Sequence, residues 1–356
     1  MKILHVITSL HTGGAEKLMV DLLPRLREFG HEVELCLFNG EQTTFYKQLE
    51  KENIKIHCLG TKRDYYNIKH CFQLLKLMRG FDLVHTHNTA PQLFAAVGSL
   101  LCSVVLCTTE HNTSNRRRNW KWYAWIDRWM YKRYWKVICI SNQAEKNLRD
   151  YLPSLKNICT VFNGVDIKQF NAAHPVEAYK SSKVVVVMVA GFRYQKDQDT
   201  LIKSFSHLDK DKYELWLIGD GERRKPLECL VDNLGLRENV KFWGIRNDIP
   251  QLLQTADIVV MSSHFEGLSL SNIEGMSVNK PFIASDVDGL REVVDGYGLL
   301  FPHSDDVALA AIITTLSEDK ELYQKVAKKC WERAQMYDID KMALSYNDIY
   351  HSLEKR

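Results

Sequence analysis

Short runs of β-branched residues alternate with helical hydrophobic patterns along the whole sequence, and this alternation narrows the choice of fold most. Residues 3–8 form such a run, and residues 15–26 follow with apolar side chains at helical spacing. We predict further strands at 33–38, 82–87, 104–109, 137–140, 184–190, 213–218, 240–243, 258–261, 281–285 and 298–301. Strands separated by helices form parallel sheets with helices on both faces, so the predicted class is α/β.

The length of 356 residues favours two domains. Residues 171–182 are polar and aperiodic and contain Pro175, so we interpret them as a linker. The predicted domains are residues 1–170 and 183–337, and we expect a helix at 338–356 to pack back onto the N-terminal domain. Each half begins with a strand, a loop and a helix, which predicts two Rossmann-like parallel-sheet domains. Ligands of such sheets bind beyond the carboxyl ends of the strands, here in a central cleft that the two domains face.

Charge, hydropathy and cysteine usage exclude several classes of protein. The net charge of +3 is small for this length and argues against a nucleic-acid partner. No stretch reaches about 18 uncharged apolar residues, so we expect no transmembrane helix, and the first segment is typical of a strand rather than a signal peptide. The nine cysteines are scattered without a C-x-x-C pair. This usage is typical of reduced thiols and predicts a cytoplasmic protein.

Two glutamates, Glu266 and Glu274, follow the predicted strand at 258–261 with seven residues between them. If a helix starts at 269–271, Glu266 lies in the loop before it and Glu274 lies within it. Backbone N–H groups at such a start bind phosphate, and the two carboxylates accept hydrogen bonds from sugar and ribose hydroxyls. The same spacing also fits an ordinary N-terminal acid and a solvated helix residue.

Arg193 and Lys196 lie in the loop after the predicted strand at 184–190. Fixed cations in such a loop can bind a phosphate group and stabilise negative charge that develops on it during a reaction. With two cations and a helix terminus, no metal ion is required. The chain also contains D-x-D triplets, a pattern that can bind a divalent metal ion. Here the triplets are typical of turns and helix starts, so we do not interpret them as a metal site. The alternative for Arg193 and Lys196 is a solvated turn.

Six segments resemble, in order, the family four retaining glycosyltransferases of GT-B type. They are TSLHTGGAEKLMVDLL, FDLVHTHN, VFNGVD, VAGFRYQKDQDTLIKSF, the stretch with the two glutamates and NKPFIASDVDGLREVV. The resemblance implies that Glu274 holds the ribose, that Glu266 binds hydroxyls of the transferred sugar, and that the diphosphate meets the backbone of Gly267, Leu268, Ser269 and Leu270. The family usually has an arginine where this chain has Gly191, and Arg193 is its candidate substitute.

The N-terminal half offers weaker candidates. Gly13 and Gly14 follow the first predicted strand, where glycine lets a ligand approach the backbone, and the resemblance places them beside the donor sugar and the acceptor. His111, after the strand at 104–109, resembles a family histidine beside the reacting sugar, with a loop histidine bonded to backbone as the alternative. His85 and His87 share one strand face, and we favour a structural role for them over a metal pair.

Residues 116–136 combine eight basic residues with five tryptophans and one acid. This mixture suits a helix at an anionic membrane surface. It equally suits a helix that packs Trp125, Ile126, Trp129 and Met130 on its own sheet with the charges in water.

We therefore predict a metal-independent retaining glycosyltransferase without a cofactor. It would move a sugar from a nucleotide diphosphate donor to a glycan or lipid-linked acceptor in surface polysaccharide or lipopolysaccharide assembly, at the inner face of the membrane. UDP and GDP are both open as the donor nucleotide. The alternatives are a nucleotide-sugar epimerase of the same fold and a non-catalytic carbohydrate-binding protein.

Overall fold

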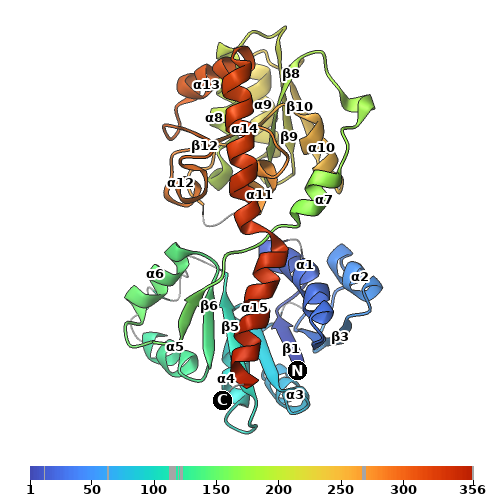
Figure 1. Ribbon diagram of the computed structural model, residues 1–356, viewed down its shortest axis with the longest axis vertical. Coiled ribbons are helices and arrows are strands. Elements are labelled where there is room, and N and C mark those ends of the chain that lie inside the picture. The colour runs from blue at the N-terminus through green and yellow to red at the C-terminus, as the bar shows by residue number, and fades with distance from the viewer. Residues whose placement is uncertain are drawn as a thin grey trace. The chain divides into compact units, whose positions relative to one another are not determined.

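The chain divides into two compact units in a computed structural model of the protein, which describes residues 1–11, 13–61, 64–111, 118, 120, 123–266 and 270–354. Unit 1 comprises Met1–Gly164 and Ile339–Arg356, and unit 2 comprises Val165–Asp338 (Figure 1). Among the described residues, no helix has both the length and the apolar character needed to cross a bilayer.

Unit 1 contains a parallel sheet of seven strands in the order β3-β2-β1-β4-β5-β6-β7. The strands are β1 (Lys2–Ile7), β2 (Glu32–Leu37), β3 (Lys55–Cys58), β4 (Leu83–His87), β5 (Val105–Glu110), β6 (Lys136–Cys139) and β7 (Ile158–Thr160). The helices are α1 (Gly14–Glu28), α2 (Thr44–Lys51), α3 (Ile68–Met78), α4 (Thr89–Gly98), α5 (Tyr123–Tyr131), α6 (Asn142–Tyr151) and α15 (Ile339–Glu354).

The strands of unit 1 bury side chains on both faces, because alternate residues point to opposite sides of a sheet. Leu4, Val6 and Val84 belong to the core on the side of α3 to α6. Ile3 and Ile7 belong to the opposite core, which includes side chains of α1 and α15. The core on the side of α3 to α6 is apolar, and the opposite core also contains buried histidines of β1 and β4. Both faces are covered by helices, as expected for an all-parallel sheet.

Unit 2 contains a parallel sheet of six strands in the order β10-β9-β8-β11-β12-β13. The strands are β8 (Val184–Val189), β9 (Tyr213–Ile218), β10 (Val240–Gly244), β11 (Ile258–Met261), β12 (Phe282–Ser285) and β13 (Leu299–Phe301). The helices are α7 (Ile167–Ala172), α8 (Gln198–Ser204), α9 (Arg224–Asn233), α10 (Ile249–Thr255), α11 (Leu270–Met276), α12 (Asp288–Val294), α13 (Asp306–Glu318) and α14 (Lys320–Ala334).

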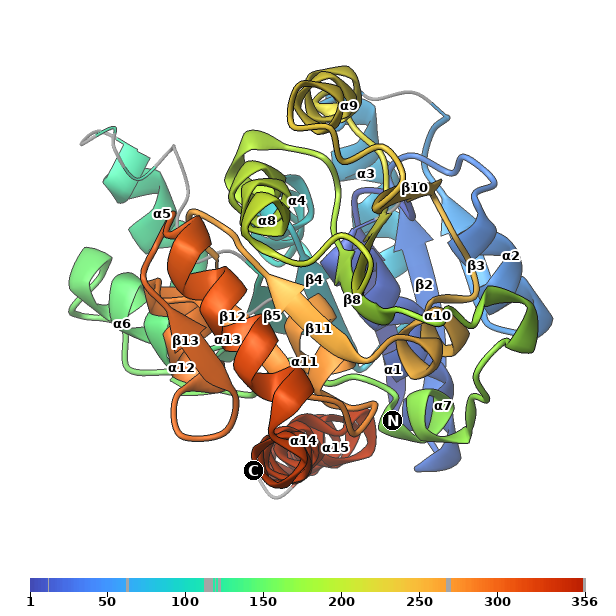
Figure 2. The ribbon, with the colours of Figure 1, turned by 90° about the horizontal axis from the view of Figure 1, so that it is seen from above.

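The strand order reverses once in each sheet, between β1 and β4 in unit 1 and between β8 and β11 in unit 2. At such a switch point the following helices leave on opposite faces, as α8 and α11 do in Figure 2. The loops after the two central strands therefore diverge and leave room for a ligand. The loops after β8 and β11 are those that carry the predicted cations and the first predicted glutamate.

The polypeptide enters unit 2 at Val165 and leaves it after Asp338, and these two residues are neighbours. The Val165 N–H donates to the Tyr337 oxygen at 2.9 Å, and Val165 forms a parallel bridge with Asp338. Residues 165–170 belong to unit 2, whereas the domain boundary predicted from the sequence places them in the N-terminal domain. There α7 packs on α10, and the Gln254 side chain donates to the Phe170 oxygen at 2.9 Å.

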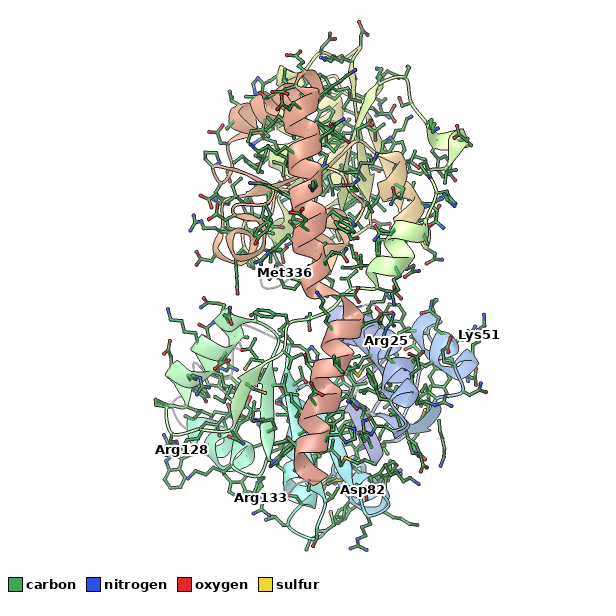
Figure 3. All side chains as sticks on the ribbon, viewed as in Figure 1. Arg25, Lys51, Asp82, Arg128, Arg133 and Met336 are labelled. Atoms are coloured by element: carbon green, nitrogen blue, oxygen red, sulfur yellow. The ribbon has the colours of Figure 1, made fainter. Side chains whose placement is uncertain are left out.

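Helix α15 is an integral part of unit 1, although it is the last helix of the chain. Tyr346 and Tyr350 are fully buried in the core beside β1 and β4. At the surface, Arg25 of α1 donates to an Asp340 carboxylate oxygen at 2.6 Å (Figure 3).

Candidate active site

The two loops at the switch point of unit 2 are bonded to each other. The His264 N–H donates to the Gln195 oxygen at 2.8 Å, and the Gln195 amide donates to the Phe265 oxygen at 3.0 Å. The Ser262 hydroxyl donates to the Asp197 oxygen at 2.8 Å. These bonds fix the backbone on both sides of the loops, so the side chains between them are held in place.

An ion pair joins the loops at their centre. Lys196 Nζ donates to Glu266 Oε1, and the Ser263 hydroxyl donates to the same oxygen at 2.8 Å. The Lys196 side chain is 16% exposed and the Glu266 side chain 6% exposed. The structure thus brings these two predicted residues together, with a carboxylate and a cation at the same place beyond the strand ends.

Arg193 lies in the same loop as Lys196 and is exposed. A Cβ atom placed on Gly191 would be 3.9 Å from Arg193 Nε. The guanidinium group of Arg193 therefore lies close to Gly191, at the point where a side chain of residue 191 would begin.

Glu274 lies in α11, four residues after Leu270, and is half-buried. The neighbouring Gly275 packs α11 tightly on the sheet, because a Cβ there would come within 2.8 Å of Val259 and Phe282 side-chain atoms. This close packing fixes the height of Glu274 above the strands. Leu270 is the first residue of α11, and the predicted phosphate-binding residues Gly267, Leu268 and Ser269 lie outside the described residues.

In unit 1 the loop after β1 brings Gly13 against an acid. Gly13 is the N-cap of α1, Gly14 is its first residue, and a Cβ at Gly13 would overlap the Glu16 carboxylate. Burial raises the pKa of Glu16. The absence of a side chain at position 13 leaves the space that the Glu16 carboxylate occupies.

His111 ends a chain of hydrogen-bonded histidines at the switch point of unit 1. His111 Nε2 lies 2.9 Å from His87 Nδ1, and His87 Nε2 lies 3.1 Å from His5 Nδ1. Burial lowers the pKa of His111 to about 4 and that of His5 to about 3, and it holds the pKa of His87 well below its usual range. All three rings are therefore neutral at pH 7, and each has one N–H and one lone pair.

The environment of His5 favours one donor direction along this row of hydrogen-bonded histidines. His5 Nε2 is buried and has no hydrogen-bond partner among the described residues. An unpaired buried acceptor costs less than an unpaired buried N–H, so His5 should donate to His87, and His87 to His111. His111 is then left with its N–H on Nδ1.

His85 is a core residue with both ring nitrogens engaged. Its Nδ1 lies 2.6 Å from the Tyr350 hydroxyl, and its Nε2 lies 2.8 Å from the Thr109 hydroxyl. His5 completes the buried group, although no motif in the sequence marks it as a candidate. The available signal was that His5 lies on the first strand, which a Rossmann order places beside the strand of His85 and His87.

The aromatic and basic segment at 116–136 is only partly helical in the described part. Helix α5 buries Met130 and Tyr131, whereas Trp125 is 82% exposed and Trp129 is 38% exposed. The packing alternative for this segment was therefore wrong for both tryptophans. Arg128, on the same helix, lies at an outer edge of unit 1 (Figure 3).

The start of this segment is tied to the end of β5 by a buried ion pair. Arg118 donates to Glu110 Oε2 at 3.2 Å, with the Arg118 side chain 10% exposed and that of Glu110 7% exposed. The other oxygen of Glu110 accepts hydrogen bonds from the Tyr131 hydroxyl and the Gln92 amide. Glu110 directly precedes His111, so this network also positions the histidine.

The sequence models of two protein families match this chain. The family described as Glycosyltransferase Family 4 matches residues 12–169, and the family described as Glycosyl transferases group 1 matches residues 169–333. Both define enzymes that transfer sugars. Since the two matches together span residues 12–333, the chain belongs to the group 1, family 4 glycosyltransferases.

Known proteins resemble the chain over most of its length. A UDP-Gal:α-D-GlcNAc-diphosphoundecaprenol α-1,3-galactosyltransferase of Escherichia coli is 24% identical over 80% of this chain and 79% of its own. The capsular polysaccharide biosynthesis glycosyltransferase CapH of Staphylococcus aureus is 24% identical over 99% of both chains. The crystal structure of Anabaena HepE in complex with UDP superposes with a TM-score of 0.87 at 21% identity, over 99% of this chain and 100% of the other. The predicted GT-B class with two Rossmann-like domains is confirmed.

Proposed function

We propose that this glycosyltransferase uses a nucleotide diphosphate sugar, retains the configuration at the anomeric carbon and needs no metal ion. The Lys196–Glu266 pair at the β8/β11 switch point is the observation that carries the proposal. A cation and an acid held together in this way suit a ligand that has both a diphosphate and sugar hydroxyls.

In the proposed reaction the bond between the anomeric carbon and the diphosphate oxygen breaks, and a bond to the acceptor oxygen forms on the same face. The acceptor proton goes to the departing phosphate. Lys196 and Arg193 stabilise the charge that develops on the diphosphate, which lowers the barrier more than it tightens ground-state binding. Glu266 accepts hydrogen bonds from sugar hydroxyls, and Glu274 accepts those of the ribose.

We assign the acceptor side to unit 1. Gly13 and Gly14 allow close approach to the backbone, and neutral His111 with its N–H on Nδ1 donates a hydrogen bond to the reacting sugar. The low pKa of His111 supports a role as a hydrogen-bond donor and not as a cation at pH 7.

We further propose UDP as the nucleotide, since the Escherichia coli relative is named for a UDP-galactose donor and HepE was crystallised with UDP. The test is thermal unfolding of the full chain with UDP or GDP, each with and without EDTA. A nucleotide at 100 times its dissociation constant stabilises the folded protein by about 2.7 kcal/mol. UDP should raise the melting temperature whether or not EDTA is present, and Glu274→Ala should lose most of the shift.

The control for this test is Glu238→Ala, which removes an exposed acid of unit 2 and should keep the full shift. A shift that vanishes in EDTA would overturn metal independence. A shift of equal size in Glu274→Ala would remove the ribose assignment. Incubation of the enzyme with donor alone separates the epimerase, because rapid conversion of the donor to an epimer would favour that activity.

We also propose that unit 1 contacts an anionic membrane, where a polyprenyl-linked acceptor would be found. The exposed face of α5 presents Trp125, Trp129 and Arg128, and Leu100 and Leu101 are exposed at the end of the adjacent α4. Arg133 joins the two segments through hydrogen bonds to Ser99 at 3.3 Å. Tryptophans beside basic residues favour the lipid–water interface.

Co-sedimentation with vesicles that contain an anionic lipid tests this contact. Replacing both Trp125 and Trp129 by serine should weaken vesicle binding at least about tenfold, since each buried aromatic contributes roughly 1.5–3 kcal/mol. Trp331→Ser is the control, because Trp331 on α14 of unit 2 is 37% exposed, close to the 38% of Trp129. Equal binding of the double variant and the control to vesicles would contradict the proposed surface.

A further inference from the structure

Three potential metal ligands converge beside the two loops of unit 2. Asp197 follows β8, His264 follows β11 and His303 follows β13. One ligand atom from each lies within 4.8 Å of the other two. His264 Nδ1 is 2.8 Å from His303 Nε2 and 3.5 Å from Asp197 Oδ2. Ligand atoms around a Zn²⁺ ion with bonds of about 2.0–2.2 Å lie at similar separations from one another.

Neighbouring groups already orient these ligands. Asp197 adopts a left-handed conformation with φ of 46°, and its carboxylate accepts hydrogen bonds from the Thr200 N–H at 3.3 Å and the Thr200 hydroxyl at 2.7 Å. The His264 backbone is bonded to Gln195, and its ring lies 4.6 Å from that of Tyr194. Such outer contacts are what hold a metal ligand in its binding orientation.

An ion can reach this group from solvent. His303 is exposed and His264 is half-buried, whereas Asp197 is buried beneath them. The histidines of unit 1 offer a contrast, because His5, His85 and His87 also have nitrogens within 4.8 Å of one another but are fully buried. Both nitrogens of His85 are bonded to hydroxyls at 2.6 and 2.8 Å, whereas His303 Nε2 has a longer contact of 3.3 Å with the Ser304 hydroxyl besides its bond to His264.

We propose that Asp197, His264 and His303 form a binding site for a divalent transition-metal ion such as Zn²⁺ or Co²⁺. Two imidazoles and one carboxylate are a ligand set that such ions accept, with further positions left for water. The inference goes beyond the proposed sugar transfer and assigns the ion no part in it. Since the ligands lie on three loops, two of which contain Lys196 and Glu266, a bound ion would fasten the loops of the active site together.

Metal binding requires a rearrangement of protons in the histidine pair. The hydrogen bond between His264 and His303 needs one proton between their facing nitrogens, and the ion needs the lone pairs of both. The proton must therefore move to the other nitrogen of its ring, and both rings must be neutral. Affinity should accordingly fall in acidic solution, because protons compete with the ion for the imidazole lone pairs.

The test is titration of Co²⁺ and Zn²⁺ into EDTA-treated, tag-free full-length protein at pH 7.5 without nucleotide. Wild-type protein should show a rise in melting temperature and a Co²⁺ absorption spectrum of nitrogen and oxygen ligands. His303→Ala should weaken binding at least about tenfold, because loss of even an outer-shell partner commonly costs 10- to 100-fold. His207→Ala is the control, since His207 forms an exposed pair with Asp306 at 2.7 Å on the same unit.

Several outcomes would overturn the proposal. Binding that is unchanged in His303→Ala would place the ion elsewhere. Intense thiolate bands in the Co²⁺ spectrum would point to cysteine ligands, for which Cys58 and Cys229 are exposed. A UDP-dependent melting shift that survives in His303→Ala shows that the variant is folded, and it separates a failure of this site from a failure of the proposed donor site.

Discussion

Replacing Lys196 by alanine is expected to lower kcat/KM for sugar transfer by about 100- to 1000-fold. A preorganised donor aimed at developing negative charge typically contributes this much to the rate. The measurement is release of nucleoside diphosphate from UDP-sugar in the presence of a polyprenyl-diphosphate-linked sugar. The loss should appear mainly in kcat, since the proposed interaction strengthens as the bond to the diphosphate breaks.

The matched control for Lys196 is Lys241→Ala. Lys241 also pairs with a buried glutamate of unit 2, Glu214, at 2.8 Å, but it lies on β10 away from the switch point. It should retain nearly full activity. If Lys196→Ala transferred sugar at close to the wild-type rate while remaining folded, the loop pair would have only a structural role.

Replacing Glu110 by alanine is expected to reduce the free energy of unfolding of unit 1 by about 3–5 kcal/mol. The change removes one partner of a buried ion pair and leaves the Arg118 cation uncompensated. The Tyr131 hydroxyl and the Gln92 amide lose their shared acceptor as well. The free energy of unfolding is measured by urea titration of the wild-type and variant proteins, with a spectroscopic signal that reports on unit 1.

Glu32→Ala serves as the comparison for Glu110. Glu32 pairs with Lys2 at 3.1 Å on the surface of the same unit, where ion pairs contribute roughly 0–1 kcal/mol. Equal stability losses in the two variants would mean that the Glu110–Arg118 pair is solvated in solution.

The class of fold was predictable because parallel strands and covering helices leave strong hydrophobic patterns. Runs such as 184–190 and 213–218 correspond to β8 and β9, which are buried except at the two ends of β8. The placement of Lys196 and Glu266 in the loops after two central strands was predictable, because ligands of such sheets bind beyond the carboxyl ends of the strands. The pairing itself is a contact between residues 70 positions apart, which no local pattern encodes.

Other features depend on contacts that the sequence does not display. His5 joins His87 only because β1 lies beside β4, and the hydropathy of either strand alone does not reveal it. The exposure of Trp125 depends on which side of α5 meets α4. Trp125 and Trp129 lie on one face and the buried Met130 and Tyr131 on another, and both faces are apolar, so the sequence leaves that choice open. The unit boundary at Val165 is set by its bridge to Asp338, far along the chain.

The position of α15 has a consequence for biosynthesis. Unit 2 is continuous in sequence and can complete its core as soon as its own residues have left the ribosome. Unit 1 must wait for the final helix, because the hydroxyls of Tyr346 and Tyr350 are the buried partners of Thr109 and His85. The half of the protein that begins first in the sequence is therefore the last to complete its core, and the sheet face that α15 covers stays exposed until α15 has been made.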